Sequence, residues 1–400
     1  MLQMLNAALQ AVEPQRLVFD ALRNEQHKEI ALVAIGKAAS GMIRGARAAL
    51  NGQVAESLVI TAAAYADGLP ADVAWVEGSH PLPDEKSLAA GEALLAFIKR
   101  QSASCKFLFL VSGGASAMVE VLAPGVTLDQ LQRVNRWLLG SGLSIRQVNC
   151  VRKAMSQIKG GGLLSRTGER EVLCLLVSDV PGDDPGSIGS GLLVAAGSGP
   201  GERLADLSLP GWILDSLPAG GRSAVSREAE IWIIASNSTA LGGAAREAQR
   251  LGFETHQHRQ LLQGDAIGAA QQIAGYLREA PPGIHLWGGE TTVRLPPQPG
   301  RGGRNQQLAL AAAIELRGCE DVLLLSAGSD GIDGNSSDAG ALIDGGTMQR
   351  GEAQGLDALA HLHSANANRF LAESGDLVHT GPTGTNVMDI VIACKIANNI

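Results

Sequence analysis

The chain has 400 residues, of which 45% are hydrophobic and 18% charged, and its formal net charge is −8. This length exceeds that of an ordinary domain with a single hydrophobic core, so two domains are expected. The acidic balance and the lack of a long basic run argue against a nucleic-acid partner. No apolar run approaches the ~20 residues that span a bilayer, and the N-terminus does not have a signal-peptide pattern. Five cysteines without a C-x-x-C pair are typical of reduced thiols in a cytoplasmic protein.

Short apolar runs alternate with longer amphipathic stretches along the whole chain. Continuous apolar runs of about five or six residues are typical of strands in a sheet that is covered on both faces. Their alternation with helical patterns predicts an α/β fold with mostly parallel sheets. Two capping boxes, Thr127 with Gln130 and Ser144 with Gln147, predict the starts of two helices. The predicted strands are 30–35, 57–61, 107–111, 172–177, 231–235, 284–287, 322–326 and 387–393.

A domain boundary is expected in the stretch 197–226, which is rich in glycine and proline and has little periodicity. The first α/β domain would then comprise residues 1–225 and the second residues 226–400. The last predicted strand, 387–393, belongs to the second domain or returns to the first, and the sequence leaves both arrangements open.

Lys37 follows the first predicted strand, after Gly36, and is expected to open a helix. In open α/β folds, ligands bind at the carboxyl ends of strands, where a lysine and a helix N-terminus both suit a phosphate. The segment is not a Walker A loop, because Ala31 stands where the upstream glycine belongs and Ala38 replaces Ser or Thr. A solvated lysine in a turn is the competing interpretation.

A second loop, Ser112, Gly113 and Gly114, follows the strand predicted at 107–111. Its backbone N–H groups are suited to cradling an anion, and a plain strand-to-helix turn explains the residues equally well. The acids Asp179 and Asp184 follow the strand predicted at 172–177. Asp179 is the better candidate for holding Mg²⁺ or a substrate hydroxyl, because Asp184 lies beside proline and glycine as a turn residue would.

The second half of the chain carries three further polar segments next to predicted strands. Glu290 is followed by a glycine-rich stretch that leads through Arg304 into a helix, and guanidinium groups bind phosphate or carboxylate in a bidentate manner. Asp330 follows the strand at 322–326, where a Mg²⁺ or substrate-hydroxyl role and a structured turn are equally favoured. Asn386 lies in a hydroxyl-rich segment before the last strand. No G-x-G-x-x-G follows a strand, which argues against a dinucleotide.

Taken together, these segments resemble the class II glycerate kinases, the family with a MOFRL-type C-terminal domain. Each segment is weak alone, and eight in one order are specific for the family. The resemblance extends from about residue 30 to residue 393 and is carried by IGKAASGM, GSHPLPDEKS, VSGGASA, VSDVPGD, GGETTV, GRGGRNQ, SAGSDGIDGNSSDAGA and TGPTGTNVMDI.

The resemblance implies a Rossmann-like N-terminal domain, a MOFRL-type C-terminal domain and an active site in the cleft between them. It implies ATP-dependent phosphorylation of D-glycerate to 2-phosphoglycerate with Mg²⁺, with the family's important lysine at Lys37 and its important arginine at Arg304. Gln307 is a departure, because the family usually has Glu there. The expected partners are D-glycerate and ATP, without nucleic acid or membrane, and a homo-oligomer is left open.

Within this mechanism, Lys37 and Arg304 would stabilise charge on the transferring phosphoryl group, and Asp179 would bind Mg²⁺ or accept the hydroxyl proton. Glu290, Asp330 and Asn386 are secondary candidates for binding. Relatives have also been named hydroxypyruvate reductases, from their place in tartrate pathways, so an NAD(P)-dependent reductase is the alternative. A non-catalytic binding protein for a sugar acid is a third.

Overall fold

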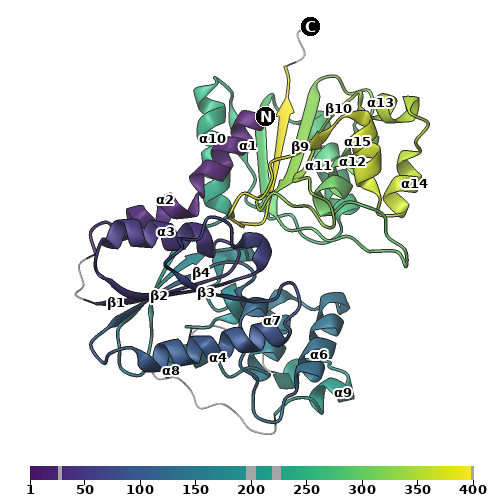
Figure 1. Ribbon diagram of the computed structural model, residues 1–400. Helices are drawn as coiled ribbons and strands as arrows, with labels where there is room; N and C mark the ends of the chain where they lie inside the picture. The colour runs from purple at the N-terminus through teal and green to yellow at the C-terminus, as the bar shows by residue number, and fades with distance from the viewer. Residues whose placement is uncertain (26–28, 195–203, 219–226, 398–400) are drawn as a thin grey trace. The chain divides into compact units, whose positions relative to one another are not determined.

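The structure is a computed structural model that describes residues 1–25, 29–194, 204–218 and 227–397. The described chain divides into two compact units, each with its own sheet and helices (Figure 1). The first unit is Pro14–Ala235, and the second joins Met1–Glu13 to Ser236–Ile400. The predicted boundary after residue 225 is thus too early, because the strand predicted at 231–235 pairs with the first sheet. The α/β class is confirmed.

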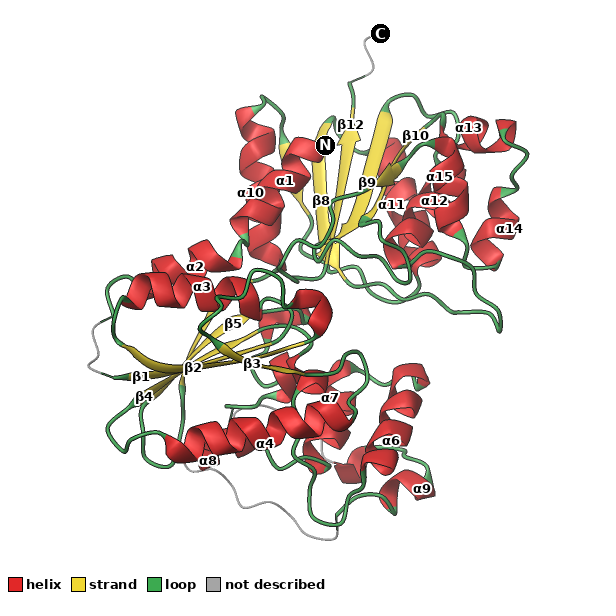
Figure 2. Ribbon diagram, in the orientation of Figure 1, coloured by secondary structure: helices red, strands yellow, loops and turns green. Residues whose placement is uncertain are grey.

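A fully parallel six-stranded sheet forms the centre of the first unit, in the order β3-β2-β1-β4-β5-β6. The chain changes direction across the sheet between β1 and β4, and doubly wound sheets of this order bind ligands at that crevice. Helices α2 and α3 cover one face, and α4 and α8 cover the other (Figure 2). The strands are β1 (Ile30–Ile35), β2 (Val54–Thr61), β3 (Ala74–Glu77), β4 (Lys106–Val111), β5 (Val172–Val177) and β6 (Glu230–Ala235).

The apolar composition of the strands in the first unit follows from their burial between two layers of helices. Every residue of β1 and β5 is buried, as expected for strands with helices on both faces. Both predicted capping boxes are present, at the starts of α6 and α7. The helices are α2 (Pro14–Leu22), α3 (Ala39–Leu50), α4 (Glu85–Arg100), α5 (Ala115–Met118), α6 (Leu128–Gly140), α7 (Ile145–Ala154), α8 (Gly162–Arg166) and α9 (Gly211–Leu214).

The second unit holds a mixed sheet in the order β11-β10-β9-β12-β8-β7, whereas the sheet of the first unit is parallel throughout. Only β7 and β8 pair in parallel among its described strands. The physical reason is that β12 enters antiparallel between β8 and β9, so that it belongs to this unit and does not return to the first. The strands are β7 (Thr255–Gln257), β8 (Gly283–Gly289), β9 (Val322–Gly328), β10 (Gly340–Asp344), β11 (Leu377–Val378) and β12 (Asp389–Lys395).

The N-terminal helix α1 (Leu2–Ala11) packs in the second unit, against α10 (Figure 1). Gly243 permits this close approach, since a Cβ there would lie 2.7 Å from the Ala7 carbonyl oxygen. Among the described residues, no helix combines the length and apolarity that crossing a membrane requires. The remaining helices are α10 (Asn237–Arg250), α11 (Ala266–Glu279), α12 (Arg304–Glu315), α13 (Thr347–Ala353), α14 (Ala358–His363) and α15 (Ala367–Ser374).

Candidate active site

Two sets of predicted site residues gather at two sheet edges, one in each unit. We call the carboxyl ends of β1, β4 and β5 the first edge. We call the carboxyl ends of β8 and β9, together with the start of β12, the second edge. Since β12 runs antiparallel to β8 and β9, its N-terminus lies beside their carboxyl ends, and Asp389 pairs with both Gly289 and Gly328.

At the first edge, the turn after β1 interlocks with the loop after β4. The Lys37 N–H donates to the Gly113 carbonyl at 2.9 Å, and the Ala38 N–H donates to the Ser112 Oγ at 3.0 Å. Gly36 has a φ of +121°, and a Cβ there would lie 2.4 Å from the Ser112 Oγ, so only glycine fits. The buried Ser112 hydroxyl therefore holds the two loops together.

Lys37 lies one residue further out, over the glycine loop. It is in the turn before α3, which begins at Ala39, so it does not itself open the helix. A Cβ on Gly114 would lie 3.4 Å from the Lys37 Cγ and 3.1 Å from the His80 Cδ2. The Lys37 Nζ is 5.6 Å from the centre of the Tyr65 ring. The structure thus brings Lys37, Gly113 and Gly114 together at the point where the sheet changes direction.

The two acids after β5 differ in their surroundings. Asp179 is half-buried and follows Ser178, whose N–H donates to the Ala235 carbonyl at 2.9 Å at the end of the neighbouring strand β6. Asp184 is a turn residue, as the sequence predicted, but it is not fully solvated. It is also half-buried, and its carboxylate accepts from the Gly186 N–H at 3.1 Å and the Ser187 hydroxyl at 2.7 Å. It closes its own turn, which proline and glycine alone do not reveal.

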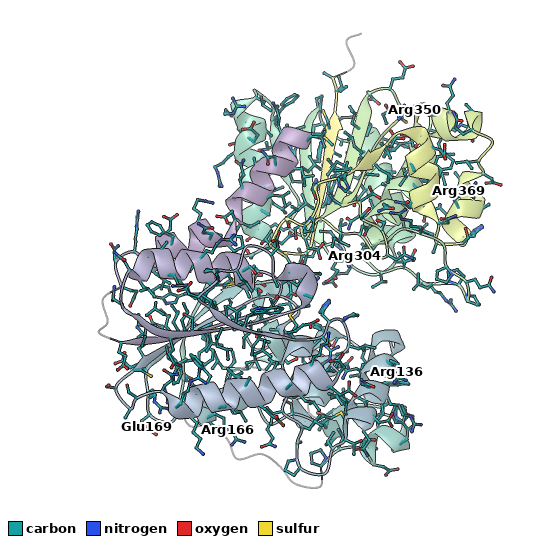
Figure 3. The ribbon with its side chains drawn as sticks, in the orientation of Figure 1. Arg136, Arg166, Glu169, Arg304, Arg350 and Arg369 are labelled. Carbon is teal, nitrogen blue, oxygen red and sulfur yellow. The ribbon has the colours of Figure 1, made fainter. Side chains whose placement is uncertain are left out.

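At the second edge, Arg304 is the centre of an ion-pair network (Figure 3). Its Nε and Nη2 donate to the two carboxylate oxygens of Asp389 at 2.6 and 2.9 Å, and its Nη1 lies 3.1 Å from the Glu290 Oε1. The side chain of Asp389 is 6% exposed, that of Arg304 32% and that of Glu290 44%. Burial lowers the pKa of Arg304, but Asp389 and Glu290 outweigh it, so the pKa lies above its usual value.

Asp333 fixes the start of α12, on which Arg304 is the first residue. Its carboxylate accepts from the N–H groups of Asn305 at 3.1 Å and Gln306 at 2.9 Å. The Asn305 side chain continues the network to the Asp389 Oδ1 at 2.9 Å. Burial raises the pKa of Asp333 to about 6, although these two N–H groups favour the charged form. The network holds Arg304 in one orientation through the buried acids Asp389 and Asp333 and the exposed Glu290.

Of the other residues considered in the second half of the chain, Asp330 and Asn386 lie at this edge, and Gln307 lies in the interior of the unit. The Asp330 carbonyl accepts from the Thr383 N–H at 3.2 Å, which places the loop after β9 against the segment before β12. Asn386, half-buried, lies in that segment. Gln307 does not reach the edge, because its amide Nε2 donates to the Leu362 carbonyl at 2.9 Å in the interior of the unit. A Gln in place of Glu thus leaves the contacts of Arg304 unchanged.

Sequence reasoning missed Asp389 and Asp333 as site residues. Asp389 lies 85 positions from Arg304 and Asp333 lies 28 positions from Asn305, so no local spacing connects them. Asp389 is the first residue of an apolar strand, and a charge in that place was the available signal. Asp333 stands among several acids and turn residues, where nothing singles it out.

A hollow of about 880 Å³ lies at the opposite end of the first sheet, beside the amino end of β2. It is lined by Arg47 and Arg100 among others, and these pair with Asp72 at 2.5 Å and Glu56 at 2.8 Å. Because ligands of parallel sheets bind at the carboxyl ends of the strands, and two of the three arginines of this hollow are already paired with acids, it is not the candidate site.

The described residues contain no cluster of three or more His, Cys, Asp or Glu side chains arranged to hold a metal ion. Mg²⁺ does not need such a cluster, because it is usually held by one or two carboxylates together with waters and substrate phosphates. A single half-buried carboxylate at a strand end, such as Asp179, fits this type of binding.

Comparisons with known proteins cover almost the whole chain. Residues 1–207 match the family described as a domain of unknown function, DUF4147, and residues 283–389 match the MOFRL family. A D-glycerate 2-kinase of Thermotoga maritima is 34% identical, over 98% of this chain and 96% of its own length. A protein of Agrobacterium vitis, provisionally named a hydroxypyruvate reductase, is 33% identical over 96% of this chain and 91% of its own. A crystal structure of glycerate kinase from Thermotoga maritima superimposes with a TM-score of 0.84, at 32% identity and 98% coverage of both chains.

Proposed function

The chain belongs to the glycerate kinase family with DUF4147 and MOFRL domains, and from this premise we propose that it transfers the γ-phosphoryl group of ATP to the 2-hydroxyl of D-glycerate. The products are ADP and 2-phosphoglycerate. The observation that carries the proposal is the full-length similarity to a D-glycerate 2-kinase, together with a crystal-structure match of the same coverage. The predicted site residues agree with it, because they gather at strand ends in both units.

Phosphoryl transfer needs positioning and charge neutralisation more than covalent chemistry from the protein. Lys37 supplies a cation beside the glycine loop, where backbone N–H groups meet the phosphates. Arg304 supplies the second cation, and Asp389 and Glu290 fix its plane. Because about a third of the Arg304 side chain is exposed, at 32%, it remains accessible to the transferring group. Preorganised charges of this kind stabilise a transition state without reorganisation during the reaction.

Asp179 has the remaining task, which is to hold Mg²⁺ or to accept the proton of the 2-hydroxyl. When bound, Mg²⁺ supplies neutralisation of the phosphate charge. Asp330 and Asn386 contribute substrate contacts from the loops at the second edge. None of the five cysteines forms a disulfide, which fits a reducing compartment, and we place the protein in the cytoplasm.

The proposal is tested by measuring ADP release with D-glycerate, ATP and Mg²⁺, and in parallel NADH oxidation with hydroxypyruvate. We expect ADP only when D-glycerate is present, and no NADH turnover. NADH oxidation without ADP release would assign the chain to the reductases. Binding of glycerate without either reaction would make it a sugar-acid binding protein.

A further inference from the structure

Three basic side chains of the first unit, Lys159, Arg152 and Lys153, have fewer acidic neighbours than they have positive charges. Lys159 and Glu120, both buried, form an ion pair. Arg152 and Lys153 occupy the last turn of α7 and are both half-buried, and the charge of Arg152 interacts with both members of this pair. The Arg152 Nε donates to the Asn135 Oδ1 at 2.9 Å, which is a neutral acceptor.

Lys153 is the least compensated member of this group. Among the described residues, no hydrogen bond and no ion pair within 4 Å holds its ammonium group. Asp184 is its acidic neighbour, but that carboxylate already accepts from the Gly186 N–H and the Ser187 hydroxyl. Burial lowers the pKa of Lys153, and Asp184 offsets this only in part. A half-buried cation without a partner is unfavourable unless an anion comes to it.

The surroundings hold Lys153 in place without neutralising it. Its stem packs on Gly160, where an added Cβ would lie 3.3 Å from the Lys153 Cγ and Cδ. The backbone of Gly160 donates to the Ser190 carbonyl at 3.0 Å. Asn149, one helical turn before Lys153 and on the same face of α7, accepts from the Ser190 hydroxyl at 2.8 Å and donates to the Ser187 carbonyl at 3.2 Å.

These contacts connect Lys153 to the first edge. The Ser190 hydroxyl lies 2.6 Å from the Ser116 hydroxyl, and Ser116 is in α5, directly after the glycine loop. The segment that carries Asp179 ends in this same Ser187–Ser190 turn. Lys153, at the end of α7, therefore lies beside the loops that follow β4 and β5, where ligands of a parallel sheet bind.

We propose that Lys153 binds the carboxylate of the substrate, with the Asn149–Ser190–Ser116 hydrogen bonds as the support that positions it. This inference rests on the proposed function, because D-glycerate is the small carboxylate that the site would take. It assigns the task of substrate binding to a cation other than Lys37 and Arg304, which serve the phosphoryl group. A charge-assisted contact of this kind contributes about 1.5–3 kcal/mol, which corresponds to roughly 10- to 150-fold in affinity.

The test compares wild type with Lys153→Gln, Lys153→Met and Lys99→Gln, the last removing an exposed lysine of the same unit. For both Lys153 variants we expect at least a tenfold rise in KM for D-glycerate, KM for ATP within twofold, and Tm unchanged or higher, because a partly buried charge is removed. Wild type should prefer D-glycerate strongly over uncharged glyceramide, and the variants should lose this preference. Lys99→Gln should behave as wild type.

Calorimetric binding of D-glycerate separates this inference from the proposed function. Wild-type ADP release with an unchanged KM for D-glycerate in the Lys153 variants would overturn the inference and leave the function standing. Binding that depends on Lys153, without ADP release by wild type, would overturn the function alone. A lower Tm with unchanged binding would mean that Lys153 serves the fold. If the Gln variant does not fold, Met, which replaces the stem with a similar apolar volume, provides the same comparison.

Discussion

The two edges solve the problem of holding a cation in opposite ways. At the first edge, backbone hydrogen bonds and tightly fitted glycines position Lys37. At the second edge, the carboxylates of Asp389, Glu290 and Asp333 position Arg304 and the helix that carries it. A backbone-built edge tolerates loss of its lysine, whereas an edge built from buried acids depends on its arginine for stability. Activity and stability should therefore separate at Lys37 and be coupled at Arg304.

Replacement of Arg304 by alanine should have the largest effect. We expect kcat to fall roughly 10²-fold or more, the usual scale for removing a preorganised charge. An exposed cation contributes little to stability, but Arg304 is held by the buried carboxylate of Asp389. Asp389, 6% exposed, would lose its charged partner and keep the Asn305 amide, so the free energy of unfolding should fall by roughly 2 kcal/mol. This is below the 3–5 kcal/mol of fully buried pairs, because solvent reaches the arginine.

Urea denaturation and steady-state rates of Arg304→Ala, Arg304→Lys and the exposed-site control Arg136→Ala measure both effects. The lysine variant keeps the charge but loses the bidentate contact, so it should recover part of the stability and little of kcat. A fully active or fully stable Arg304→Ala would contradict the description of the second edge.

Lys37→Ala should lose kcat on a similar scale, roughly 10²-fold, with a Tm close to that of wild type. The reason is that the interlocking bonds at this position come from the Lys37 backbone N–H and its neighbours, and alanine retains them. Rate measurements and thermal denaturation of the same preparations check this. A Tm decrease as large as that of Arg304→Ala would remove the contrast between the two edges.

Asp179→Asn should lower kcat about 10- to 100-fold or shift its Mg²⁺ requirement upward, while Asp184→Asn should affect the rate little. Asp179 comes within two residues of the end of β5, whereas Asp184 is engaged by Gly186 and Ser187 of its own turn. A Mg²⁺ titration of initial rate for wild type and both variants decides between the acids. Equal losses, or a loss in Asp184→Asn alone, would place the metal or base on the other acid.

Asp333 gives the second edge a pH-dependent contribution to stability. Its pKa of about 6 in the folded state lies above the ordinary 3.8, so the folded protein binds the proton more tightly than the unfolded chain. This contribution to stability is present below pH 4 and disappears as the pH rises through 6. Between pH 4.5 and pH 7, the loss of this contribution should lower the free energy of unfolding by about 2 kcal/mol.

Denaturation of wild type and Asp333→Asn at several pH values in this window tests the assignment. In Asp333→Asn, this decrease in the free energy of unfolding with rising pH should be absent. The absolute stability of the variant is lower than that of wild type, because one oxygen acceptor is replaced. Asp129→Asn, an exposed acid of the first unit, should keep the wild-type profile. Parallel profiles for wild type and Asp333→Asn would show that Asp333 titrates normally.

The sequence predicted the first edge better than the second, and the reason is physical. Lys37 and the Ser112–Gly114 loop are local features, because a buried strand followed by glycine predicts a tight turn at the carboxyl end of that strand within a few residues. The support of Arg304 is non-local, since Asp389 arrives on a strand inserted from the end of the chain. The same insertion makes the second sheet mixed. Apolar runs show that a strand exists, but its direction and neighbours are decided by tertiary pairing.

The position of the transferred phosphoryl group tests the central claim most directly. Wild-type protein incubated with D-glycerate, ATP and Mg²⁺ should yield a product whose phosphorus couples, in a ³¹P–¹H correlation spectrum, to the single proton on C2. Coupling to the two protons on C3 would show that the chain phosphorylates the other hydroxyl. The absence of any phosphorylated glycerate, while the protein is folded and binds ATP, would contradict the kinase assignment itself.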